Sequence, residues 1–178
     1  FPTRRSSDLL KVLLLVSMVF GVVGCQPRDA STAKTNGSLD ASTFLATSEP
    51  TGAIPVGEAR EKTEDGQEVT LVGRIGGSSK PFIDGLAAFT IVDPKVPFCA
   101  PDEGCPTPWD YCCQTEAVKS NIATVKIIGE AGAPVSQSAR DLLNVKELAT
   151  VVVKGKAKRD DQGNLIVSAN QVFVRPGE

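Results

Sequence analysis

From about residue 67 onward, the apolar positions of this sequence recur with a period of two, which is the spacing of side chains on one face of a β-strand. In the first such segment, Val69, Leu71 and Ile75 fall on one face. Four later segments follow the same pattern. The predicted strands are residues 67–75, 87–93, 122–128, 150–158 and 165–174, with a bend in the last one between Ala169 and Gln171.

Two segments carry helical signals. Residues 56–62 form a helix candidate that ends before the Asp65-Gly66 turn, and Ser138 with Asp141 opens a short helix to about residue 144. The order β-β-β-α-β-β is that of the five-stranded OB-fold barrel. Glycines inside the first and fourth strands suit the tight bends of a small barrel. We predict an all-β, OB-fold-like domain with one or two short helices over residues 53–178, and a small β-sandwich as the alternative.

The sequence before this domain has a different character. Residues 25–52 are rich in Ser, Thr, Ala, Asp and Gly, which predicts a flexible tether. Residues 12–24 form an apolar run that is too short for a membrane-spanning helix and typical of a secretory signal. The run ends at Gly24-Cys25 and resembles a bacterial lipobox. This resemblance implies cleavage before Cys25 and acylation of its thiol, with palmitate as one of the chains that anchor the protein.

We therefore predict a lipoprotein signal peptide over residues 9–24. An ordinary signal peptide that is cut elsewhere, with Cys25 a free thiol, is the alternative. Residues 1–8, FPTRRSSD, resemble a translated sequencing adapter and are set aside from the fold.

Composition narrows the possible chemistry. The chain of 178 residues has no histidine, which removes Ser-His and Cys-His nucleophile pairs and the commonest nitrogen ligand of metals. Its net charge of −2 gives no general attraction to nucleic acid. Lys154, Lys156 and Lys158 form a basic stripe, which we interpret as a solvated outer face. No catalytic constellation is evident, so we predict that the protein is not an enzyme.

Four of the five cysteines lie in one predicted loop, residues 95–114, between the second and third strands. They are Cys99, Cys105, Cys112 and Cys113, and residues 105–113 read CPTPWDYCC. An exported domain meets an oxidising compartment, so we expect two disulfides and no cofactor. Adjacent cysteines rarely bond, which leaves Cys99–Cys112 with Cys105–Cys113, or Cys99–Cys113 with Cys105–Cys112.

The alternative for these cysteines is a metal site that holds zinc, copper or an iron–sulfur cluster, because clustered thiolates suit all three. The usual C-x2–4-C pairs of structural zinc sites are absent, and this counts against a metal. Thiol–disulfide catalysis is disfavoured because there is no C-x-x-C motif.

The same loop carries Trp109 and Tyr111, the only tryptophan and the only tyrosine of the chain, on either side of Asp110. These aromatic residues either pack the loop onto the barrel rim or project as contacts for a partner. We take Trp109, Tyr111 and Asp110 as the candidate contact residues.

Four segments, GRIGG, AAFTIVDP, CPTPWDYCC and VKGKAKRDDQGNL, together resemble a family of uncharacterised bacterial secreted lipoproteins. The resemblance spans about residues 50–175 and implies no assigned activity. The sequence thus predicts an OB-fold binding module that faces the periplasm or the exterior from a lipid anchor. Its expected partners are the membrane and an unknown envelope protein or small ligand, and the alternative function is metal binding or handling by the four cysteines.

Overall fold

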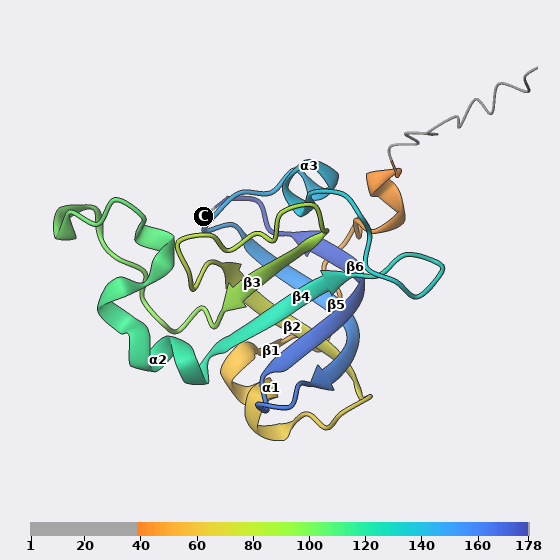
Figure 1. The fold of residues 1–178 in the computed structure, drawn as a ribbon, viewed down its shortest axis with the longest axis horizontal. Helices are drawn as coiled ribbons and strands as arrows, with labels where there is room; N and C mark the ends of the chain where they lie inside the picture. The colour runs from red at the N-terminus through yellow and green to blue at the C-terminus, as the bar shows by residue number, and fades with distance from the viewer. Residues whose placement is uncertain (1–38, 178) are drawn as a thin grey trace, which may run out of the picture. The chain divides into compact units, whose positions relative to one another are not determined.

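The computed structural model describes residues 39–177, and Figure 1 shows their fold. The strands are β1 (Ile54–Pro55), β2 (Glu68–Ile75), β3 (Ala88–Val92), β4 (Ile122–Ile127), β5 (Thr150–Arg159) and β6 (Leu165–Val174). The α-helices are α1 (Val56–Lys62), α2 (Thr115–Ser120) and α3 (Ala139–Leu143). The 3-10 helices are η1 (Ala41–Thr43), η2 (Pro101–Glu103), η3 (Pro108–Asp110) and η4 (Cys112–Gln114).

Five of the strands close into a barrel. Their order is β2-β3-β4-β6-β5, and β5 pairs again with β2 to complete the ring. All neighbours in the ring are antiparallel except β4 and β6, which run parallel. With α3 between β4 and β5, this is the strand order of an OB-fold, so the predicted fold class is confirmed.

The period of two in the sequence corresponds to the inner and outer faces of the barrel. Leu71 and Ile75 of β2 and Val151, Val153 and Ala157 of β5 all point into one buried aliphatic core. The predicted outer stripe of β5, Lys154, Lys156 and Lys158, is exposed. The barrel core therefore follows directly from the alternation of apolar and polar residues.

A bulge bends β6 where the sequence predicts it. Lys154 pairs with Gln171 while Gly155 pairs with Ala169, so Asn170 is the extra residue. A Cβ atom on Gly155 would lie 2.2 Å from the carbonyl oxygen of Ser168. Glycine is therefore required at this position so that the two strands can approach each other at the bend.

The packed part of the chain begins upstream of the predicted domain boundary at residue 53. Phe44 is buried in the barrel core, and the backbone N–H of Ala46 donates to the carbonyl of Val172. The short strand β1, which sequence alternation does not reveal, pairs in parallel with β2. The end of the predicted tether is thus part of the domain.

Two further sequence predictions concern the start of α3 and the segment before residue 39. Ser138 precedes α3 as expected, but its side chain makes no capping hydrogen bond, so that part of the helix signal is wrong. The predicted adapter, the signal peptide and the lipidated Cys25 lie outside the described residues. Within residues 39–177, every helix is too short or too polar to cross a bilayer.

Candidate metal centre

The cysteines lie in a segment that joins β3 to β4, residues 94–121, which we call the cysteine arm. The sequence predicts a cysteine-rich loop over residues 95–114, and the structure adds that the arm contains the short 3-10 helices η2, η3 and η4 followed by α2. Figure 1 shows it in green, with α2 leading into β4. Within this loop, local hydrogen bonds and five prolines between residues 94 and 121 shape the backbone into short helical turns.

These turns bring the four cysteine sulfurs together. All four Sγ atoms lie within 4.8 Å of one another. The Sγ atom of Cys112 lies 3.2 Å from that of Cys105, 3.5 Å from that of Cys99 and 3.8 Å from that of Cys113. None of the four forms a disulfide in the structure. The sulfurs therefore converge although their sequence spacing lacks the usual pairs.

Asp110 fixes the turn that carries Cys112. Its Oδ2 accepts a hydrogen bond from Thr107 Oγ1 at 2.6 Å, and its Oδ1 accepts one from the backbone N–H of Cys112 at 2.9 Å. The bond from Thr107, and then that from Cys112, hold the pKa of Asp110 below its usual value. Both carboxylate oxygens are thus engaged within the arm, and Asp110 is not among the group of potential ligands.

Tyr111 anchors the arm to the barrel. Its side chain is fully buried, in a small cluster with Val92, Val96 and Val118 that is separate from the barrel core. Its backbone is left-handed, with φ of 58°, a conformation uncommon for residues other than glycine. This turn sends the Tyr111 side chain inward while the sulfurs of Cys112 and Cys113 remain exposed.

The barrel is shaped to receive this part of the arm. The backbone N–H of Gly77 donates to the carbonyl of Trp109 at 2.8 Å, and the Trp109 indole N–H donates to the carbonyl of Ser79 at 3.2 Å. A Cβ atom on Gly76 would lie 2.6 Å from that same Trp109 oxygen and 2.9 Å from the Tyr111 ring. The last two glycines of the GRIGG motif therefore form the surface of the barrel against which the arm packs.

These contacts decide between the two interpretations of the aromatic residues. The packing of Trp109 and Tyr111 onto the barrel rim is confirmed. As an exposed partner contact, Tyr111 is wrong, because no part of its side chain reaches solvent. Trp109 and Asp110 are half-buried, and their role toward a partner stays a prediction.

The four thiols influence one another's protonation. The backbone hydrogen bond from Cys113 lowers the pKa of Cys99. The hydrogen bond with Cys112 lowers the pKa of Cys105, but hydrogen bonding to Cys99 and burial outweigh it and raise this pKa to about 11. Hydrogen bonds with Cys105, Cys99 and Cys113 raise the pKa of Cys112 further still. Without a cation, Cys105 and Cys112 therefore keep their protons at neutral pH.

The arrangement suits one small cation rather than a multi-iron cluster. Four sulfurs placed tetrahedrally at about 2.3 Å from a zinc ion would lie about 3.8 Å apart, close to the separations found here. A cubane cluster would need space for several iron and sulfide atoms between the cysteines. The residues that the sequence predicts as disulfide or metal ligands, Cys99, Cys105, Cys112 and Cys113, thus form a single group within metal-binding distance.

Other residues that shape this site were not predicted from the sequence. Thr107 supports Asp110, and Gly76 makes room for the arm. The GRIGG motif offers a signal in retrospect, because two adjacent glycines at the end of a strand often mark a close backbone approach.

Comparison with known proteins does not assign the chain to a family. No protein-family model matches the chain, and no curated protein matches it in sequence. One solved structure with a similar arrangement is that of a "putative aspartyl-tRNA synthetase" from Leishmania major Friedlin, with a TM-score of 0.40 and 9% sequence identity. The match covers 75% of this chain and 24% of that chain, so this protein spans about a quarter of its length.

Proposed function

We propose that this protein is an OB-fold module of the bacterial cell envelope whose cysteine arm binds a single thiophilic metal ion, Zn²⁺ or Cu⁺. The observation that carries this proposal is the convergence of four unbonded cysteine sulfurs within 4.8 Å of one another. Thiolates are the preferred ligands of both ions, and a four-sulfur site is typical of zinc.

Residues around the sulfurs hold the metal-ligand candidates in place. The Asp110 carboxylate holds the turn before Cys112, and the Tyr111 side chain fixes that turn to the barrel. Residues that orient metal ligands in this way raise the affinity of a site by reducing its freedom before binding. Three of the sulfurs lie at partly or fully exposed positions, so an ion has access to the site from solvent.

Metal analysis combined with intact mass tests this proposal. The purified chain, prepared under argon and loaded with Zn²⁺ or with Cu⁺, should hold one ion per molecule and four reduced thiols. The variant with all four arm cysteines changed to serine should hold none, and its barrel should remain folded by circular dichroism. Absence of a bound ion from the reduced wild-type chain would refute metal binding.

A disulfide-stapled arm is the second candidate. It is favoured by the shortest sulfur separation, 3.2 Å between Cys105 and Cys112, and by the oxidising compartment that export implies. The pairing would then be Cys105–Cys112 with Cys99–Cys113. In the same mass measurement, this form would lack metal and weigh about 4 Da less than the reduced chain, since each disulfide removes two hydrogens.

The envelope location rests on the lipobox-like sequence before Cys25 and on the resemblance to secreted lipoproteins. Two or three acyl chains on Cys25 would anchor the domain stably, where a single chain binds only reversibly. Labelled palmitate should be incorporated into the protein when it is expressed in bacteria, and the label should be lost in Cys25→Ala. If the wild-type protein incorporates no label, the proposed lipid anchor is refuted, while the proposed metal site is unaffected.

A further inference from the structure

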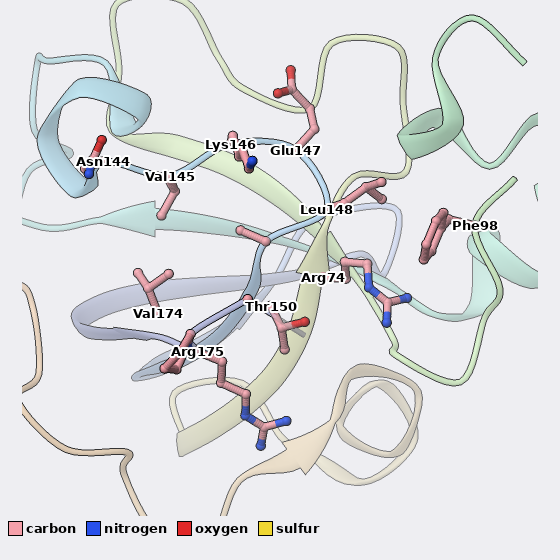
Figure 2. Close-up of a pocket in the computed structure, with 13 residues that line it drawn as sticks. Arg74, Phe98, Asn144, Val145, Lys146, Glu147, Leu148, Thr150, Val174 and Arg175 are labelled. Carbon is pink, nitrogen blue, oxygen red and sulfur yellow. The ribbon is translucent and has the colours of Figure 1, made fainter. Parts of the chain in front are cut away.

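A second candidate site lies beside the base of the cysteine arm. It is a pocket of about 810 Å³ at the ends of β2 and β6, lined also by the loop that joins α3 to β5. This volume is within the range of about 300–1,000 Å³ that is typical of small-molecule sites. Figure 2 shows Arg74 and Phe98 together on one side of the pocket and Val145 and Val174 on the other.

Arg74 gives the pocket a positive charge. Its guanidinium lies 5.0 Å from the centre of the Phe98 ring, and it is close enough to the Tyr111 hydroxyl to lower that group's pKa against the larger, raising effect of burial. Two other charged residues line the pocket and form ion pairs: Glu147 pairs with Arg140, and Arg175 pairs with Glu49. Among residues 39–177, no carboxylate forms an ion pair with Arg74.

The rest of the pocket wall is largely apolar, and backbone hydrogen bonds to β2 hold its loop in place. Phe98 is 38% exposed, a large apolar surface next to the guanidinium. Leu148 lines the pocket in a left-handed conformation, with φ of 63°, which is an outlier for a bulky residue. The backbone N–H of Leu148 donates to the carbonyl of Ile75, and the N–H of Ile75 donates to the carbonyl of Ala149, both at 2.9 Å. This loop is therefore pinned to β2 in a strained conformation, as is common at ligand sites.

We infer that this pocket binds a small amphiphilic organic anion. A carboxylate or sulfonate group pairs with the Arg74 guanidinium, whose planar fork suits such groups, and the apolar body lies against Phe98, Leu148 and Val174. Lys146, which also lines the pocket, adds to its positive potential. This inference does not rest on metal binding by the cysteine arm.

The probe that tests it is anilinonaphthalene sulfonate, an aromatic anion that fluoresces when it leaves water. The full chain should bind it at one site, and octanoate should displace it while octanol of the same length should not. Arg74→Gln should weaken binding about tenfold or more, because a charge-assisted hydrogen bond is lost. Lys158→Gln, which removes an equal charge from the exposed outer face of β5, should leave binding unchanged.

Equal displacement by octanoate and octanol would overturn the inference, and so would equal probe binding by Arg74→Gln and wild type. The displacement comparison uses wild-type protein alone, so it stands even where Arg74→Gln does not fold. Repeating the titration with the four-cysteine serine variant separates this site from the metal centre, because pocket binding is expected to persist there.

Discussion

The barrel and the cysteine arm are stabilised in different ways. Each of the five barrel strands pairs with two neighbours in the ring around one mostly aliphatic core. The arm has helical turns of three to six residues, and its small buried cluster joins Val96, Tyr111 and Val118 of the arm to Val92 of β3. A barrel with a continuous core resists local opening. An arm with so few apolar contacts depends for its stability on its contacts with the barrel, and on a metal ion or disulfides that link its sulfurs.

Because of this difference, we expect that each region can be destabilised without unfolding the other. Substitutions in the barrel should change the global free energy of unfolding. Substitutions in the arm should change its local opening and its affinity for metal while the barrel remains folded. The predictions below test that separation, beginning with the largest expected effect.

Gly155→Ala should destabilise the whole barrel by about 3 kcal/mol, because overpacking against rigid groups costs energy that side-chain rotation cannot relieve. The added Cβ atom would lie 2.2 Å from the Ser168 carbonyl oxygen and 2.6 Å from the Ala169 Cα atom. Urea unfolding followed by circular dichroism measures the change. Gly129→Ala is the matched control, since the nearest atom to its Cβ lies at 3.6 Å, and it should cost less than about 0.5 kcal/mol.

Tyr111→Ala should reduce the opening free energy of the arm by about 3 kcal/mol, since it removes the largest side chain of the arm's small core. Hydrogen exchange of amides in residues 94–121 should quicken accordingly, while amides of β5 and β6 keep their protection. Equal loss of protection in the arm and the barrel would show that the two regions unfold as one unit.

Tyr111→Phe is the control for that experiment. The Tyr111 hydroxyl is buried without a hydrogen-bond partner of good geometry among the described residues. Its removal takes away both a desolvated polar group and its interaction with Arg74, two effects of opposite sign, so exchange in the arm should match wild type to within about 0.5 kcal/mol.

Metal affinity should rise steeply with pH. Cys105, with its pKa raised to about 11, and Cys112, whose pKa is raised as well, are protonated below pH 9 and must lose their protons to bind a cation. Because at least these two protons are released, the apparent affinity for Zn²⁺ should increase at least about 100-fold per pH unit between pH 6 and 8. Competition with a chelator of known pH dependence measures this slope, and a flat profile would exclude these thiols as ligands.

The sequence predicts the barrel better than the arm for a physical reason. In β2 and β5, the buried face can be read from every second residue, because strand geometry ties sequence spacing to orientation. The arm has no such periodicity. Its shape depends on the Asp110 carboxylate, on the left-handed backbone of Tyr111 and on the distant Gly76. The four cysteines are visible in the sequence, but their convergence depends on these non-local contacts, so their spacing alone does not reveal how close together the sulfurs lie.

Asp110→Ala should have the smallest effect on metal binding, a loss of affinity for Zn²⁺ of about tenfold, because groups that orient ligands typically contribute factors of 10 to 100. The substitution removes the acceptors for Thr107 Oγ1 and for the backbone N–H of Cys112, but it leaves all four sulfurs in place. One ion per chain should therefore still bind at saturation. Asp102→Ala, an exposed carboxylate of the same arm, removes equal charge and should leave affinity within about twofold. If the two variants lose affinity equally, Asp110 acts through its charge and not by positioning Cys112.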